Sequence, residues 1–321
     1  MAHLIARIAP QRATQYADMA AILALPELEI SPLGAVVTDA EIVSLAGQPY
    51  VKMAIPESPT ALPMFATLSE WFEYFETLGD ETGPFLRPLP IGEGLRFTPD
   101  LVEARRYKGK TNELLTHFLI NIAQWTHGNA PRILFDPMAG GGTLAFTALR
   151  LGFSVLGVER DREAVAGTDV FLRTYFQQER IKHSRMQEKR KAGQRFRFTL
   201  PQEQTITIAQ GETRDSRSLL EGLPGTPRAD LVVGDLPYSI QHSARQPLPA
   251  LLAEALPIWF DLAAPGAVLA LSWNGTMLKR EQMLEIVAKG GWHPMTSGAY
   301  DRMAHQVDRV IKVRDIVVAR R

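Results

Sequence analysis

The 321-residue sequence contains no cysteine. This absence excludes disulfides, thiolate catalysis and Cys-based zinc or iron–sulfur sites. The histidines show no paired spacing of the kind that metal ligands need, so we expect no metal. Any catalytic chemistry must therefore come from other residue types.

The sequence also lacks an excess of either charge, because its 35 Lys and Arg balance its 35 Asp and Glu. A strong attraction of the whole molecule to phosphate backbones is therefore not expected. Nucleic-acid binding would have to use a local basic patch.

No long hydrophobic run is present. A membrane helix needs about 18–20 consecutive apolar residues, and residues 1–7 lack the apolar core of a signal peptide. We expect no membrane partner and a cytoplasmic protein. Because 45% of the residues are hydrophobic and 22% are charged, the chain can bury a full core, and we expect one large domain and a smaller one.

The smaller domain is predicted at residues 1–95, as an α+β domain. Runs at 41–45 and 50–55 are typical of strands. Four apolar residues then recur at helical spacing and predict one core-facing side of a helix, with a base-stacking platform as the alternative: Leu68, Phe72, Phe75 and Leu78. The segment 83–94, rich in Pro and Gly, predicts a linker or a crossing strand.

The larger domain is predicted at residues 96–321. Apolar strand-like runs alternate there with helical segments, at 132–136, 154–159, 205–209, 230–235 and 267–272. This alternation predicts an α/β fold, with a mostly parallel sheet covered on both faces and ligands beyond the carboxyl ends of the strands. The final run, 309–319, has no room for a crossover helix and predicts an antiparallel edge.

A glycine turn follows the first of these runs. Asp136 ends the run, and three consecutive glycines let the backbone pass close to a ligand. Contiguous glycines depart from the G-x-G-x-x-G spacing of dinucleotide turns, and an anionic Asp136 suits the ammonium and sulfonium charges of S-adenosylmethionine. We expect this cofactor to contact Asp136, Pro137, Ala139, Gly140, Gly141, Gly142 and Thr143.

Two further polar segments follow later runs. Glu159 ends the second run, where a carboxylate accepts hydrogen bonds from ribose hydroxyls, and Arg160 follows it. Alternatively, Glu159, Arg160 and Asp161 form a solvated cap of the next helix. Asp215 and Ser216 follow the third run and offer partners for the adenine ring, or form a polar turn with a helix cap. NAD enzymes also use an acidic residue like Glu159, so a dehydrogenase remains an alternative.

The tetrapeptide Asp235-Leu236-Pro237-Tyr238 favours a methyltransferase over a dehydrogenase. An exocyclic amine on a base is a poor nucleophile because its lone pair is delocalised into the ring. Asp235 and the carbonyl of Leu236 can orient that lone pair towards a methyl donor. Pro237 restricts the turn, and Tyr238 can stack on a flipped base.

The sequence resembles the Rossmann-fold amino-methyltransferases in the order of four features: the segment 136–143, Glu159, Asp215 and the segment 235–238. Within these enzymes it resembles the RNA methylase group, which includes the tRNA guanine-N2 methyltransferases. The resemblance covers about residues 95–321 and implies a seven-stranded sheet. It also implicates three residues in holding the methionine end of the cofactor: Lys110, Thr111 and Asn112.

The resemblance also bears on the acceptor base. The family's tetrapeptide is usually Asp-Pro-Pro-Tyr or Asn-Pro-Pro-Tyr, and here Leu236 replaces the first proline. Aspartate at the first position is more common in guanine-N2 and cytosine-N4 enzymes than in adenine-N6 enzymes.

A basic stretch between the second and third runs is the candidate phosphate patch, with a solvated helix extension as the alternative. Its candidate residues are Lys182, Arg185, Lys189, Arg190 and Lys191. Residues 1–95 carry no recognisable THUMP signature and are expected to be a different RNA-binding or accessory module.

The sequence therefore predicts S-adenosylmethionine-dependent methyl transfer to an exocyclic amino group of a nucleic-acid base, with guanine N2 in tRNA as the expected target. Two alternatives besides the dehydrogenase remain. One is an N4-cytosine or N6-adenine DNA methyltransferase, and the other is a non-catalytic nucleic-acid-binding scaffold.

Overall fold

The computed structural model divides into two compact units, residues 1–94 with 296–316 and residues 95–295 with 317–321. The structure describes residues 2–9, 14–56, 62–69, 71–78, 85–89, 97–107, 109–190, 193–224, 228–237, 247–307 and 313–321. Within these ranges, no helix is long and apolar enough to cross a membrane.

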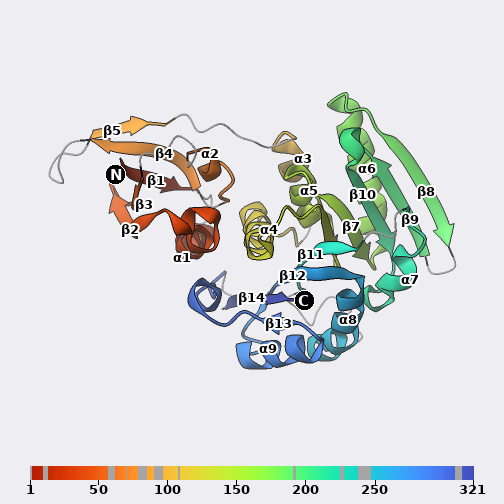
Figure 1. Ribbon diagram of the computed structural model, residues 1–321. Coiled ribbons are helices and arrows are strands. Elements are labelled where there is room, and N and C mark those ends of the chain that lie inside the picture. The colour runs from red at the N-terminus through yellow and green to blue at the C-terminus, as the bar shows by residue number, and fades with distance from the viewer. Residues whose placement is uncertain are drawn as a thin grey trace. The chain divides into compact units, whose positions relative to one another are not determined.

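The first unit is built on a five-stranded antiparallel sheet of order β2-β3-β1-β4-β5 (Figure 1). Its elements are β1 (Ala2–Ile8), α1 (Thr14–Ile30), β2 (Thr38–Leu45), β3 (Gln48–Ile55), α2 (Leu62–Phe65), β4 (Trp71–Leu78) and β5 (Phe85–Pro88). The strands predicted at 41–45 and 50–55 are confirmed as β2 and β3. Leu4 pairs with Met53, and both are buried together with Met19 and Leu23 of α1, which packs on β1, β2 and β3.

The helix predicted across residues 68–78 is wrong, because residues 71–78 form strand β4. Phe75 pairs with Ile5 of β1 on one side and with Pro88 of β5 on the other. Tyr74 is buried and Phe75 is half-buried, and aromatic residues are enriched in such pleated, half-buried strands. Pairing with distant strands therefore outweighs the local helical spacing. Part of the segment predicted as a linker, Phe85–Pro88, is the strand β5.

The second unit contains a sheet of order β13-β14-β12-β11-β6-β7-β10-β9-β8 (Figure 1). The strands are β6 (Ile133–Asp136), β7 (Ser154–Glu159), β8 (Ser184–Arg190), β9 (Gly193–Thr199), β10 (Thr205–Gln210), β11 (Ala229–Asp235), β12 (Ala263–Asn274), β13 (His293–Pro294) and β14 (Arg314–Arg320). The neighbours from β12 to β10 run parallel, and the pairs β13/β14, β10/β9 and β9/β8 are antiparallel. The α/β fold with an antiparallel C-terminal edge is confirmed.

The sheet has nine strands in the described ranges, not the seven that the family resemblance implies. The two additional strands are β8 and β9, a hairpin inserted between α6 and β10. The basic stretch lies largely in this hairpin, so the alternative of a helix extension is wrong.

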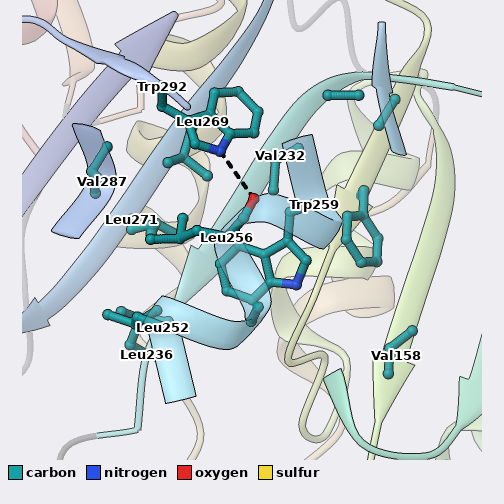
Figure 2. Close-up of a cluster of buried hydrophobic side chains, with 14 of the residues drawn as sticks. Val158, Val232, Leu236, Leu252, Leu256, Trp259, Leu269, Leu271, Val287 and Trp292 are labelled. Atoms are coloured by element: carbon teal, nitrogen blue, oxygen red, sulfur yellow. Dashed lines mark hydrogen bonds between the residues drawn. The ribbon is translucent and has the colours of Figure 1, made fainter. Parts of the chain in front are cut away.

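Helices cover both faces of this sheet. They are α3 (Asp100–Glu103), α4 (Glu113–His127), α5 (Thr143–Arg150), α6 (Arg162–Gln178), α7 (Ser216–Leu220), α8 (Leu248–Leu262) and α9 (Arg280–Lys289). Phe135 packs in a cluster with Trp259 of α8, whereas its neighbour Leu134 faces the other side of β6 and is also fully buried. Figure 2 shows this cluster, in which the Trp292 indole donates to the Leu256 carbonyl at 3.3 Å.

Candidate active site

Three carboxylates lie at the carboxyl ends of three adjacent parallel strands. Asp235 ends β11, Asp136 ends β6 and Glu159 ends β7, and these strands are neighbours in the order β11-β6-β7. The sheet therefore brings together side chains that lie about a hundred residues apart in the chain. This edge is where open α/β sheets bind ligands.

The glycine turn links β6 to α5 and is tied to β7. Gly140 and Gly142 have φ angles of +52° and +94°, which residues with a Cβ rarely adopt. The Gly140 amide donates to Glu159 Oε2 at 2.7 Å, and the Ala139 amide donates to the Val158 carbonyl at 2.9 Å. The turn is therefore held in a fixed shape at the sheet edge.

The middle glycine, Gly141, is required by a tyrosine. A Cβ on Gly141 would overlap the ring of Tyr107. The Tyr107 hydroxyl bonds the Thr143 hydroxyl and accepts from the Thr143 amide at 3.3 Å, while the Arg105 guanidinium bonds the Gly141 carbonyl. Sequence reasoning assigned this glycine to ligand approach and missed Arg105 and Tyr107. The available signal was a basic and aromatic segment just before a turn that lacks side chains.

Asp136 is almost fully buried, with 1% of its surface exposed. Its Oδ1 accepts from the Met138 amide at 3.2 Å, and its Oδ2 has no hydrogen-bond partner among the described residues. Burial, together with the nearby carboxylates of Glu159 and Asp235, raises the pKa of Asp136 to about 8. The expectation that Asp136 is anionic is therefore wrong for the ligand-free protein near neutral pH, where it is protonated. A cation placed at Oδ2 would restore the charged form.

Glu159 is half-buried, and both of its carboxylate oxygens accept a backbone hydrogen bond. Besides Gly140, the Asp161 amide donates to Oε1 at 2.6 Å. A carboxylate oxygen has two lone pairs, so each retains capacity for a ligand hydroxyl. Arg160 is exposed and lies 3.9 Å from a Glu212 carboxylate oxygen. The helix cap that was the alternative reading is made by Asp161, whose Oδ1 accepts from the Glu163 and Ala164 amides.

Asp235 is half-buried and has a defined partner. The Thr111 hydroxyl donates to Asp235 Oδ2 at 2.7 Å. Of the other residues in the tetrapeptide, Leu236 is fully buried and Pro237 is exposed. Tyr238 lies outside the described residues.

Leu236 is held on both its backbone and its side chain. Its amide donates to the Ser272 carbonyl at 2.9 Å, and its side chain packs in the hydrophobic cluster with Leu252 and Leu271 (Figure 2). A proline at this position would have no N–H for that bond. The Leu236 amide therefore makes a hydrogen bond that a proline at this position could not make.

The residues flanking Thr111 stabilise helix ends. Lys110 Nζ donates to the Val102 carbonyl at 2.7 Å and pairs with Glu113 at 2.5 Å. Asn112 is the N-cap of α4, and its Oδ1 accepts from the Leu115 amide at 3.1 Å. Through these contacts, both residues fix Thr111 beside Asp235.

Asp215 and Ser216 follow β10 at the same edge of the sheet. Asp215 is exposed, and no side-chain cap bond from it to α7 is present. Ser216 is fully buried, and its hydroxyl donates to the Thr213 carbonyl at 2.5 Å. The Asp215 carboxylate is therefore available to a ligand, whereas the Ser216 hydroxyl is already used.

The structure does not bring together Lys182, Arg185 and Lys189, the members of the predicted phosphate patch whose side chains it describes. Arg185 makes a bidentate pair with Asp169, at 2.7 and 2.9 Å. Exposed Lys189 lies at the end of β8 that is on the same side of the sheet as the carboxyl end of β10, with β9 between the two strands, whereas exposed Lys182 precedes the other end of β8. Seven residues of strand span about 23 Å. The side chain of Arg190, and Lys191 as a whole, lie outside what the structure describes.

In the described ranges, no group of three His, Asp or Glu side chains is arranged to hold a metal ion. The acidic cluster at the sheet edge instead suits a cationic organic ligand, since Asp136 Oδ2 is buried without a partner there.

Known proteins resemble the chain in structure. No protein-family model and no curated protein matches its sequence. TrmN from Thermus thermophilus matches with a TM-score of 0.50 and 11% identity, over 100% of both chains. The T. thermophilus 16S rRNA N2 G1207 methyltransferase RsmC, solved with AdoMet and guanosine, is 15% identical over 90% of this chain and 60% of that chain, with a TM-score of 0.39. A Pyrococcus furiosus methyltransferase is 13% identical over 67% of this chain and 87% of that chain, with a TM-score of 0.41.

The full-length match shows the fold. The chain has a Rossmann-like methyltransferase fold together with a small N-terminal antiparallel domain.

Proposed function

We propose that this protein is an S-adenosylmethionine-dependent methyltransferase that acts on an exocyclic amino group of a base in RNA. The observation that carries the proposal is the pairing of Thr111 with Asp235 at 2.7 Å. It holds a carboxylate at the same sheet edge as Asp136 and Glu159, in a chain with the methyltransferase fold.

The cofactor-binding residues would be those of the glycine turn and the strand ends. Asp136 would bind a positively charged group of the cofactor, Glu159 would accept hydrogen bonds from the ribose, and Asp215 would contact the adenine. When bound, S-adenosylmethionine supplies a methyl group that is activated by positive sulfur. Arg105 and Tyr107 would act as positioning residues, since they fix the turn through Gly141 and Thr143.

Asp235 would act on the acceptor. Its carboxylate accepts a hydrogen bond from the base's amino group and so localises the nitrogen lone pair towards the methyl donor. The Thr111 hydroxyl donates to Oδ2 and fixes the orientation of the carboxylate. Positioning matters more than general-base strength here, because the donor methyl is already activated.

Guanine N2 in tRNA is the proposed target. Support comes from Asp235 at the first position of the tetrapeptide, which is the commoner choice in guanine-N2 enzymes of the resembling group. A DNA substrate would contradict this part of the proposal while leaving the reaction unchanged.

The proposal is tested by replacing Asp235 with Ala. We expect loss of methyl transfer to total tRNA by a factor of at least about 100, with unchanged affinity for S-adenosylhomocysteine. The matched control is Asp261→Asn, which removes an exposed α8 carboxylate that pairs with Arg217 at 3.3 Å and should leave transfer unchanged. Full activity in Asp235→Ala would refute the assigned role.

A further inference from the structure

A surface hollow lies at the C-terminal end of α6, away from the sheet edge described above. Its volume is about 480 Å³, and it is lined by Arg173, Phe176, Gln177, Arg180, Ile181, Lys182 and His183. No acidic residue is among the lining residues, and three of them carry a permanent positive charge. The hollow is therefore suited to an anion.

The positively charged side chains of this hollow make few ion pairs with carboxylates in the described part of the chain. Arg173 Nε lies 3.4 Å from Asp169, whose carboxylate is already bound by Arg185, and about half of the Arg173 side chain is exposed. Among the described residues, no carboxylate lies within ion-pair distance of Arg180 or Lys182. A phosphate entering the hollow would thus gain charge-assisted hydrogen bonds without displacing a strong ion pair.

Arg180 occupies a position that normally favours glycine. It follows the last turn of α6 with a φ of +54°. The Ile181 amide donates to the Phe176 carbonyl at 2.8 Å, and the Arg180 amide donates to the Gln177 carbonyl at 3.2 Å. This is a Schellman ending, in which glycine is the usual residue with positive φ. A charged residue in a strained conformation suggests a role beyond closing the helix.

Two rings, those of Phe176 and His183, are among the lining residues. Phe176 is fully buried, and the exposed His183 ring lies 5.3 Å from the Phe176 ring. The His183 Nδ1 bonds the Ile181 carbonyl at 2.9 Å, which fixes the ring's orientation. A flat ring beside three cations is the combination that holds a nucleotide, with the phosphate on the cations and the base on the ring.

We propose that this hollow binds one phosphodiester-linked nucleotide of the RNA substrate, outside the methyl-transfer site. The inference rests on the proposed function. Since α6 has 17 residues, its far end lies about 25 Å from the edge that carries Glu159. A polynucleotide reaches both places at once, whereas a mononucleotide substrate does not.

The test compares two double variants of the full chain. Arg180→Gly with Lys182→Gln removes two charges from the hollow. Arg217→Gln with Lys289→Gln removes two charges from exposed side chains elsewhere in the second unit, which are 72% and 73% exposed. The probes are fluorescently labelled total tRNA and, separately, AMP. Binding is measured without cofactor over a range of salt concentrations.

We expect the hollow variant to bind tRNA about tenfold more weakly than wild type, with a salt slope smaller by about 1, because fewer phosphates are neutralised. The control variant should retain wild-type affinity and slope. Equal affinities of the two variants would overturn the proposal, as would binding of AMP as tight as that of tRNA.

The single variant Arg180→Gly separates this role from a structural one. Glycine relieves the left-handed backbone, so the melting temperature should rise while tRNA affinity falls. A raised melting temperature with unchanged affinity would overturn the proposal. The binding assay does not depend on methyl transfer. If the proposed function is wrong, the wild-type protein can still bind tRNA in this assay but will transfer no methyl group to it, so the two failures can be distinguished.

Discussion

Leu236 shows how one residue can satisfy two demands at the end of a strand. Its amide bonds Ser272 and its side chain fills the core beneath the site, while the preceding residue, Asp235, remains partly open to the edge. The hydrogen bond and the burial of Leu236 depend on packing against β12 and α8. Neither can be read from the tetrapeptide alone.

Replacing Leu236 with Ala should lower the free energy of unfolding by about 2–5 kcal/mol, because a fully buried leucine leaves a cavity. Urea denaturation measures this change. The control is Leu86→Ala on β5, a leucine that is 36% exposed, for which a change within about 0.5 kcal/mol is expected. Equal effects of the two substitutions would contradict the placement of Leu236.

Asp136 should make stability depend on pH. Its pKa is about 8 in the folded protein and about 4 when unfolded. The folded state therefore holds a proton that the unfolded state releases between these values, so this group's contribution to stability falls as pH rises from about 4 to about 8.

Asn at position 136 carries no such proton. Without cofactor, Asp136→Asn should gain stability over wild type by up to about 1.4 kcal/mol per pH unit between pH 4 and 8, with no further gain above. Urea unfolding of both proteins at several pH values measures the difference. A difference that stays constant across this range would rule out the raised pKa.

At the scale of elements, the β8–β9 hairpin is held to the sheet's helical layer by Arg195. This arginine is 4% exposed, binds Glu188 at 2.7 Å, and donates to the carbonyls of Leu219 and Glu221 at 3.0 and 2.8 Å. It thereby caps the C-terminal end of α7. In the sequence it is one of several basic residues in a charged run.

Arg195→Met should therefore cost about 2–3 kcal/mol of stability, because the Leu219 and Glu221 carbonyls and the Glu188 carboxylate each lose a hydrogen bond from a buried guanidinium. Lys189→Met in the same hairpin removes an exposed charge and should change stability by less than about 0.5 kcal/mol. Chemical denaturation compares the two variants. If Arg195→Met is as stable as Lys189→Met, the hairpin is not anchored as described.

The elements that could be predicted from sequence are the buried parallel strands, since near-continuous apolar runs such as 154–159 and 230–235 mark them locally. The order of acidic residues at strand ends likewise placed Asp136, Glu159 and Asp235 at one edge. Strand β4 was mistaken for a helix because its aromatic residues happen to recur at helical spacing, and only pairing with β1 and β5 reveals its period of two.

Contacts made across the chain could not be predicted. The packing of Tyr107 on Gly141 and the bond from Thr111 to Asp235 join residues 34 and 124 positions apart. The basic residues of 182–191 are close in the sequence, which predicted one patch. An extended strand, however, places residues at its two ends far apart. In the structure, Arg185 is neutralised by Asp169, and Lys182 and Lys189 lie near opposite ends of β8.

At the scale of the whole molecule, the first unit is discontinuous, since residues 296–316 belong to it. Ala299 and Met303 of this segment are buried. The Ala299 amide donates to Glu29 Oε1 of α1 at 3.1 Å, and Arg302 pairs with the same carboxylate. The domain boundary predicted near residue 95 assigns residues 296–316 to the larger domain, whereas the structure groups them with residues 1–94.

Removing residues 1–94 should therefore leave the 296–316 segment without its partner helix. We expect the fragment 95–321 to melt at least about 5 °C below the full chain, which corresponds to a loss of more than about 1 kcal/mol. Circular dichroism measures both transitions. A fragment as stable as the full chain would show that the returning segment does not depend on α1.

The reaction itself is tested most directly by nucleoside analysis. The protein is incubated with S-adenosylmethionine labelled in its methyl group and with either total RNA or genomic DNA, and each nucleic acid is then digested and resolved by mass spectrometry. We expect label in tRNA, on the exocyclic nitrogen of guanosine, and none with Asp235→Ala. Label in DNA alone, label on a ring carbon or ribose, or no label in either nucleic acid would contradict it.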